Sequence, residues 1–309
     1  MTCRRSPAVI AVLLALQVTV VADPVASSPA TTSNSAFERY HYSITARVRP
    51  LLVFWLSRSG VGDAVVTRGR GPAETSYSLL IGSDPDRAPR RINRWGYVEE
   101  EIRGAEARLI GLMTQSDEDS LEEAEAGLRK QASGQHPFKV IQATVDAEQA
   151  SSRVTSIVTP EDYTFRQVRT VLALALRETS DGRSRVIRLP PGTRPGFLAA
   201  IADAMHTSSP SPINYVYHGR LYELRRTRAQ KIPDLRLART SYGRATAADF
   251  IITSAYDGEQ TRFSMTYGTE GRLAEVPLTV TYQPRWWMQV DLAIDDTGEP
   301  PSLTVGADR

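Results

Sequence analysis

The chain has 309 residues, of which 37 are Lys or Arg and 35 are Asp or Glu, so its formal net charge at pH 7 is +2. This balance leaves no overall positive field, and we expect no binding to nucleic acid. Hydrophobic residues make up 41% and charged residues 23% of the chain, the usual proportions of a soluble globular protein.

The first 22 residues have the pattern of a secretory signal. Arg4 and Arg5 precede an apolar stretch over residues 7–21, and the small residue Ala22 follows it. A basic start, an apolar core and a small residue at the cut are the three parts of a signal peptide. An uncleaved anchor is the alternative, but the stretch is shorter than the roughly 20 residues that a spanning helix needs. We predict an exported protein, periplasmic or secreted, cleaved after Ala22 and without a transmembrane segment in the mature chain.

Several chemistries are excluded by the residues of the mature chain. The single cysteine, Cys3, lies in the signal, so disulfides, thiol nucleophiles and cysteine metal sites are absent. The four histidines, at positions 41, 136, 206 and 218, lack the spacing of a zinc site. The sequence also has no Gly-x-Ser-x-Gly elbow, phosphate loop or dinucleotide motif. We therefore expect neither a metal nor a cofactor.

One large domain is expected after the cleavage site. Residues 23–36 are mostly Ser, Thr, Ala and Pro, which predicts a disordered leader. Residues 37–298 are predicted to form a single β-rich globular domain, long enough to bury a stable core. Two lobes that meet near residues 190–210 are an alternative division. Residues 299–309 are predicted to be a loose tail.

The first half of this domain is predicted to contain strands and one clear helix. Residues 40–56 form one long strand, or two broken near Pro50, whose second half is apolar enough to be buried on both faces. Gly60 and Gly62 predict a turn. Acidic residues at the start and basic residues at the end predict a helix over residues 116–131. Further strands are predicted at residues 63–68, 76–81, 106–114, 138–147 and 153–158.

The second half begins with helices and ends as a meander of strands. Thr159 and Pro160 resemble the start of a helix, although residues 168–177 also alternate as a strand does, and this choice stays open. A short apolar helix is predicted at residues 193–205. A hairpin is predicted around His218 and Gly219. The other strands are predicted at residues 182–189, 250–255, 261–267, 278–282 and 286–294, with Pro284 between the last two. The expected fold is α+β and mostly antiparallel β, with a curved or half-barrel sheet and two or three covering helices.

The segment GSDPDRAPRRINRWGYVEEEI, residues 82–102, has the densest pattern of polar and aromatic residues. Arg91 and Arg94, with two further arginines, have the chemistry of an anion site. The favoured interpretation is an ordered connection between two strands, in which the arginines pair with the glutamates at positions 99–101 and Trp95 fills the core. Such a loop can also border a cleft.

A second conspicuous segment, YQPRWW, ends in Trp286 and Trp287. Adjacent residues of a strand face opposite sides of a sheet. One of the two tryptophans is therefore expected in the core, and the other faces outward or into a cleft. The sequence does not decide which.

Three segments together resemble a family of exported bacterial proteins of unknown function. They are RPLLVFWLSRSGVGDAVV, GSDPDRAPRRINRWGYVEEE and VPLTVTYQPRWWMQVDL. More distantly, the chain is similar to periplasmic half-barrel β proteins, which include lipoprotein carriers. The resemblance implies export and a curved sheet, but it assigns no activity and no site residue.

The leading functional hypothesis is a non-enzymatic envelope protein that binds an apolar ligand or lipid in a β-sheet cleft, or a partner protein. The candidate binding residues are Trp55, Arg91, Arg94, Trp95, Trp286 and Trp287. The alternative is a hydrolase of a cell-envelope polymer or glycan, with Asp84, Glu99 and Glu101 as candidate acid and base. Whether the protein is an enzyme stays open at this stage.

Overall fold

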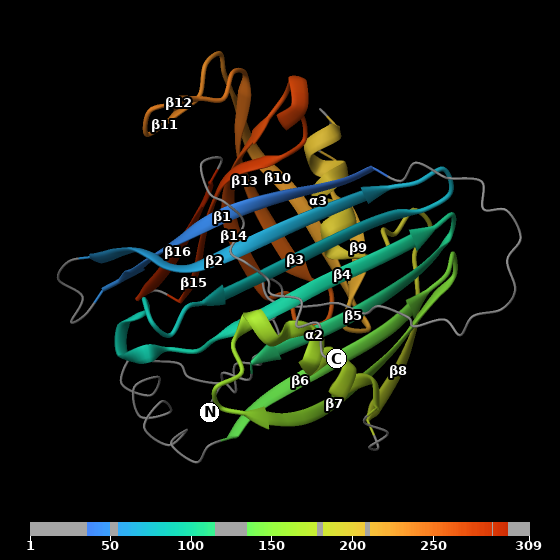
Figure 1. Cartoon of the computed structure of the whole chain (residues 1–309). Coiled ribbons are helices and arrows are strands. Elements are labelled where there is room, and N and C mark those ends of the chain that lie inside the picture. Colours follow the sequence, from blue (N-terminus) through green and yellow to red (C-terminus); the bar gives the residue numbers. More distant parts are fainter. Residues whose placement is uncertain are drawn as a thin grey trace, which may run out of the picture.

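The computed structural model describes residues 36–49, 55–114, 135–177, 182–207, 211–285 and 287–295. The predicted signal peptide, most of the leader, the helix at residues 116–131 and the tail lie outside these ranges. In the described part, 14 strands form one curved antiparallel sheet, in the order β8-β7-β6-β5-β4-β3-β2-β1-β16-β15-β14-β13-β10-β9 (Figure 1). A mostly antiparallel β fold with one large curved sheet is therefore the architecture.

The sheet consists of two wings that meet at β1 and β16. The first wing contains β1 (Ala36–Val48), β2 (Leu56–Arg70), β3 (Thr75–Ser83), β4 (Trp95–Arg103), β5 (Glu106–Thr114), β6 (Gln135–Val145), β7 (Gln149–Pro160) and β8 (Arg183–Arg188). The second wing contains β9 (Ile213–Tyr217), β10 (Arg220–Ile232), β13 (Ala245–Ser254), β14 (Gln260–Gly268), β15 (Pro277–Arg285) and β16 (Met288–Ile294). The short strands β11 (Arg236–Leu237) and β12 (Thr240–Ser241) form a separate hairpin. Pairing of β1 with β16, from Tyr42 opposite Ile294 to Val48 opposite Met288, joins the wings.

The far ends of the two wings approach each other because the sheet is strongly curved. Val216 of β9 is buried in one cluster with Leu109 of β5 and Ala150 of β7. The turn between β9 and β10 contacts β7 so closely that a Cβ atom at Gly219 would lie 2.1 Å from Ser152 Oγ. Gly219 also has a φ of +62°, which glycine adopts without steric cost.

Two α-helices occur among the described residues, one on each face of the first wing (Figure 1). Helix α2 (Val168–Arg177) packs on the outer face, where its buried residues join a cluster with Trp95 and Phe138. Helix α3 (Phe197–His206) lies between the wings, and its apolar residues join a cluster with Tyr215 and other residues of the second wing. The expectation of two or three covering helices is thus modified, because α3 is enclosed by the sheet.

The open choice at residues 168–177 is decided in favour of a helix, but the predicted helix start is wrong. Strand β7 continues to Pro160. The start lies at Thr164, whose hydroxyl accepts a hydrogen bond from Arg166 N, while the side chain of Gln167 accepts one from Thr164 N. This capping box begins the 3₁₀-helix η4 (Phe165–Gln167), which leads into α2.

The predicted turn at Gly60 and Gly62 is also wrong, because β2 passes through both glycines. The pairing of β1 with β2 shifts register there, since Ile44 pairs with Gly62 and Thr45 pairs with Ser59. The extra residues make a β-bulge, in which Gly60 has a φ of +66°. Glycines that predicted a reversal of the chain therefore produce a bend within a long strand.

Two smaller expectations about the apolar strand segments also fail. Trp55 and Leu56 are 38% and 50% exposed, so this end of the predicted buried strand faces solvent. Pro284 lies within β15, next to a register shift between Tyr282 and Arg285, and not between two strands. A proline is tolerated at such a position because the bulge interrupts the ladder of hydrogen bonds.

Candidate functional site

An apolar cavity of about 110 Å³ lies inside the curved sheet, beside α3. Its walls are aliphatic or aromatic except at two charged residues, Arg68 and Glu275. The first wing and β16 contribute Tyr40, Tyr42, Ala64, Val66, Arg68, Tyr77, Leu79 and Leu292. The second wing and its connections contribute Phe263, Met265, Glu275, Val276, Pro277 and Val280, and α3 contributes Phe197, Leu198, Ile201, Ala202 and Met205.

The alternation of side chains along the strands explains why these residues share one wall. Ala64, Val66 and Arg68 are every second residue of β2 and therefore point to the same face. Val66 pairs with Tyr40 on one side and with Leu79 on the other, so the wall continues across three strands. On α3, the wall residues recur at helical spacing, as at Phe197 and Ile201.

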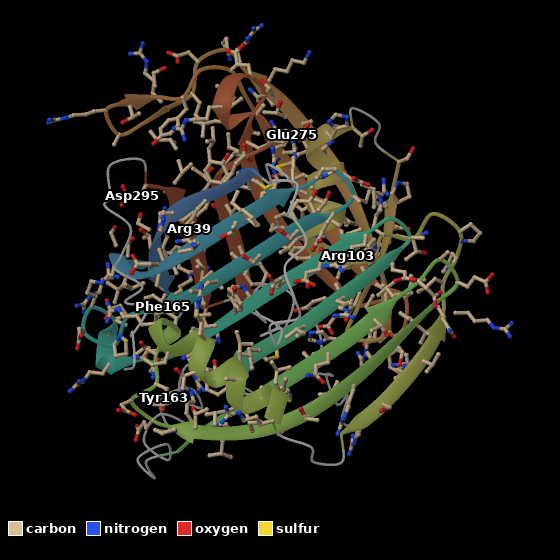
Figure 2. The ribbon with its side chains drawn as sticks, turned by 45° about the vertical axis from the view of Figure 1, so that its right-hand side comes forward. Arg39, Arg103, Tyr163, Phe165, Glu275 and Asp295 are labelled. Carbon is tan, nitrogen blue, oxygen red and sulfur yellow. The ribbon has the colours of Figure 1, made fainter. Side chains whose placement is uncertain are left out.

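A charged cluster lies at one edge of the cavity, around Glu275, which is labelled in Figure 2. The carboxylate of Glu275 lies 2.6 Å from His206 Nδ1, 3.2 Å from Arg70 Nη2 and 3.5 Å from Arg68 Nη1. Arg68 Nε also donates a hydrogen bond of 3.0 Å to Glu38. The hydrogen bond with His206 lowers the pKa of Glu275, and the charges of His206 and the two arginines lower it further, which outweighs the opposing effect of burial. Glu275 is therefore held as a carboxylate at the cavity edge.

The position of α3 depends on a fully buried carboxylate on β4, Glu100. Its oxygens accept hydrogen bonds of 2.7 Å from Leu198 N and 2.8 Å from Ala199 N, in the first turn of the helix. These N–H groups have no partner within a helix, and the helix dipole favours a negative charge there. Burial nevertheless raises the pKa of Glu100 to about 7, because it outweighs these hydrogen bonds. A Cβ atom at Gly196 would lie 2.2 Å from the carboxyl carbon, so the approach requires glycine.

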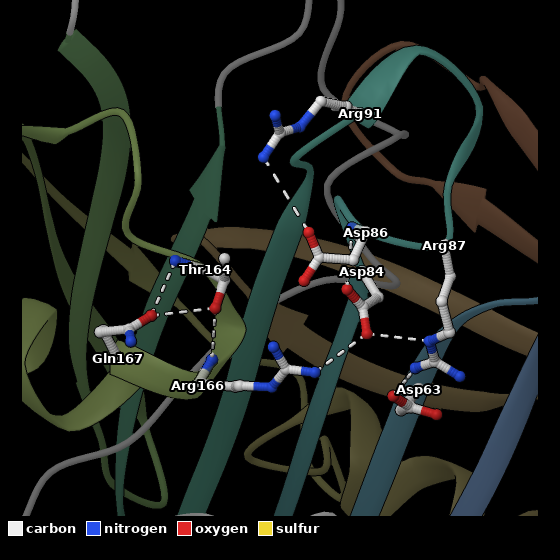
Figure 3. Close-up of polar contacts among 8 residues, drawn as sticks. All are labelled: Asp63, Asp84, Asp86, Arg87, Arg91, Thr164, Arg166 and Gln167. Carbon is white, nitrogen blue, oxygen red and sulfur yellow. Dashed lines mark hydrogen bonds and ion pairs between the residues drawn. The ribbon is translucent and has the colours of Figure 1, made fainter.

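Within the segment at residues 82–102, residues 84–94 form an ordered connection between β3 and β4, as the favoured interpretation states (Figure 3). Asp84 accepts hydrogen bonds of 2.8 Å from Arg87 Nε, 2.9 Å from Arg166 Nη2 and 3.0 Å from Asp86 N. Arg87 also pairs with Asp63. The expected pairing with glutamates is wrong for Arg87, which contacts aspartates on the loop and on β2. These contacts attach η4, and through it α2, to the connection between β3 and β4.

Asp84 is poorly suited to the role of a general acid that the hydrolase alternative gives it. Burial raises its pKa, but the hydrogen bonds from Arg87 and Asp86 N and the charges of both arginines outweigh burial and lower it below the ordinary value. Its side chain is only 4% exposed. Glu99 and Glu101 are half-buried on the outer face of β4, opposite to the cavity.

Trp95 fills the core, as the structural interpretation of its segment predicts. The residue has 0% exposure, and its ring centroid lies 4.6 Å from that of Phe138. The Nε1 of Trp95 donates a hydrogen bond of 3.2 Å to the carbonyl oxygen of Tyr163. Tyr163 and Phe165 are both labelled in Figure 2. Trp95 thus holds the segment before α2 against the outer face of the sheet.

The other candidate binding residues lie in separate places, and those that the structure describes are not in the cavity wall. Arg91 is exposed and lies 3.9 Å from Asp86, and the carbonyl oxygen of Arg94 accepts a hydrogen bond from Ser83 N. Trp55 is partly exposed, with the guanidinium of Arg49 6.0 Å from its ring centroid. Trp287 is 6% exposed, and Trp286 lies outside the described residues.

The residues of the cavity wall were not identified as a site from the sequence, although part of the signal is visible there. Alternation on β2 and the apolar face of α3 show which residues are buried. Neither pattern shows that both wings of the sheet and α3 line one cavity. A buried lining of this kind is indistinguishable in sequence from an ordinary core.

Among the residues that the structure describes, no group of three His, Asp or Glu side chains is placed to hold a metal ion. No helix in the described ranges has the length and apolar character needed to cross a membrane. Comparisons of the chain with protein-family models, with curated protein sequences and with solved structures found no match.

Proposed function

We propose that this protein is an exported envelope protein that binds an apolar or amphipathic ligand, such as a lipid, inside its curved sheet without catalysis. The cavity beside α3 is the observation that carries the proposal. Its walls are apolar apart from one charged edge, which is the usual composition of a small-molecule site. The resemblance of the sequence to exported half-barrel proteins supports export and a curved sheet, while the ligand is argued from the cavity alone.

The size of the cavity limits what it holds while α3 is in place. A volume of about 110 Å³ is of the same order as an engineered cavity that takes up benzene. It therefore accommodates a ring or part of an acyl chain, and each buried methylene contributes about 0.8 kcal/mol. A longer chain extends toward the charged edge.

Native mass spectrometry of the protein purified from its own cell envelope tests this function. We expect an added mass of lipid size on the wild-type protein. Ala202→Leu places a larger side chain in the cavity from α3 and is expected to remove the added mass. Ala173→Leu is the matched control, because Ala173 is exposed on α2. Bare wild-type protein, or a ligand that survives Ala202→Leu, would contradict the proposal.

A further inference from the structure

We infer that the ligand of the cavity is a single-chain amphiphile with a carboxylate head group, which binds at Arg68. This inference rests on the proposed function and specifies its ligand. The acyl chain lies along the apolar wall beside α3, and the head group lies at the charged edge. Two features support it, namely the position of Arg68 in the cavity wall and the contacts that Glu275 makes at its edge.

In the part of the chain that the structure describes, Arg68 is the one basic residue that lines the otherwise apolar wall, and its guanidinium contacts Glu275 at the edge. It follows Ala64 and Val66 on the inward face of β2, and its side chain is only 11% exposed. A charge in such a place is costly unless it is paired, and a guanidinium pairs best with a planar carboxylate. Among the described residues Arg68 contacts Glu38 at 3.0 Å and Glu275 at 3.5 Å, so the longer contact is the one at the cavity.

Glu275 shows that a carboxylate fits at this edge. Three groups, Arg68, Arg70 and His206, converge on its oxygens from β2 and from the end of α3. Glu275 lies in the connection between β14 and β15 with a φ of 59°, a left-handed conformation that a non-glycine residue adopts at a cost. The carboxylate of Glu275 thus occupies a position that the carboxylate of a ligand can take instead.

The direction of the ligand's acyl chain follows from the geometry of strand β2. Ala64 and Arg68 are four residues apart on β2, which corresponds to about 13 Å along the strand. Leu79 of β3 pairs with Val66, between these two levels, and Ile201 of α3 lines the same cavity. A chain that runs from Arg68 toward Ala64 therefore buries its methylene groups while the head group stays at the arginines.

The test compares decanoate with decanol, which differ only in the head group, by isothermal titration calorimetry on the delipidated protein at neutral pH. We expect decanoate to bind about tenfold more tightly, since a charge-assisted hydrogen bond is worth at least this factor. Arg68→Gln is expected to reduce the affinity for decanoate to that for decanol and to leave decanol unchanged. Arg103→Gln is the matched control, because Arg103 forms an exposed pair with Glu74 and neither residue lines the cavity.

Glu275→Gln separates ligand binding from a purely structural role of the cluster. Removal of the internal carboxylate is expected to strengthen decanoate binding by about threefold, because the ligand no longer competes with it. A structural role would weaken binding in this variant as in Arg68→Gln.

The outcomes distinguish the inference from the proposed function. Equal affinities for decanoate and decanol, or tighter binding of decyltrimethylammonium, would overturn the carboxylate head group while the apolar site stands. Failure of all three probes to bind would overturn the proposed function itself. The affinities of the wild-type protein for decanoate, decanol and decyltrimethylammonium decide these cases even if a variant does not fold.

Discussion

At the scale of single residues, Glu100 joins β4 to α3, the helix that contributes one wall of the cavity. Its neighbours Glu99 and Glu101 point to the other face of the strand, so the three successive glutamates serve different roles. Glu100 accepts two backbone hydrogen bonds at the start of α3 and has no exposure to solvent. The helix that forms one wall of the cavity therefore depends on one carboxylate.

Glu100 is expected to make stability depend on pH in a defined window. Its folded pKa of about 7 lies above the ordinary value of 4.5, so between these values the folded state binds more protons than the unfolded state. The free energy of unfolding contributed by this group is then greatest below the lower value and falls as pH rises to about 7. Urea unfolding of the wild-type protein and Glu100→Gln at pH 5 and pH 8 measures this. We expect the wild type to lose about 2–3 kcal/mol relative to the variant between the two pH values.

The matched control for this measurement is Glu101→Gln, on the opposite face of the same strand. We expect Glu101→Gln to show the same change in the free energy of unfolding between pH 5 and pH 8 as the wild type. The assignment to Glu100 would be wrong if Glu100→Gln also retained the full pH dependence.

At the scale of elements, loops and helices are fixed to the sheet by specific polar contacts as well as by apolar packing. The connection between β3 and β4 holds η4 and α2 through Asp84, while Glu100 holds α3. Asn93 adds hydrogen bonds of 3.0 Å to the carbonyl oxygens of Glu161 and Tyr163. α3 is thus attached at its first turn, through backbone N–H groups that lack helical partners, whereas α2 is attached through the segment that precedes it.

Asp84→Asn is expected to weaken the attachment of α2 and to reduce the free energy of unfolding by about 1–2 kcal/mol at neutral pH. Because the folded pKa of Asp84 is lowered, its contribution is present above the unfolded pKa and is lost as pH falls through the folded value. Denaturant unfolding should therefore show a smaller difference from wild type in acid. Arg91→Gln, at an exposed pair of the same loop, is the control and should change little. This assignment would be contradicted if Asp84→Asn reduced the free energy of unfolding more in acid than at neutral pH.

At the scale of the whole molecule, the sheet has two end strands among those described, β8 and β9. β9 is covered, because Arg194 bonds to Asn214 and Val216 along it. β8 has the sequence RSRVIR, and five of its six residues are exposed. Arginines on such a strand disfavour pairing with a second molecule, since exposed edges otherwise template aggregation.

Removal of these charges is expected to promote association. The double substitution Arg183→Thr with Arg188→Thr should produce concentration-dependent oligomers in analytical ultracentrifugation. The control, Arg47→Thr with Arg108→Thr, changes the net charge equally at positions of β1 and β5 that are paired on both sides. Equal association of the two variants would show that net charge, and not the edge, keeps the chains apart.

Local patterns in the sequence predict many elements of this protein correctly. The strand at residues 106–114, the hairpin at His218 and Gly219 and the short helix before it follow from alternation, turn residues and helical spacing. The errors occur where a residue acts through a distant partner. Gly60 and Gly62 produce a bulge because β1 and β3 pair on either side, and Pro160 ends a strand because β6 holds it there.

The tertiary structure alone decides where the candidate site lies. The sequence predicts burial of Trp95, but it does not distinguish a core residue from a cavity wall, because both require apolar side chains. Arg68, His206 and Glu275 are separated by 69 residues or more and meet only when β1 pairs with β16 and α3 packs between the wings. Residue types and their local spacing determine the strands and helices of this protein, whereas long-range pairing determines which faces enclose a cavity and which charges lie at its edge.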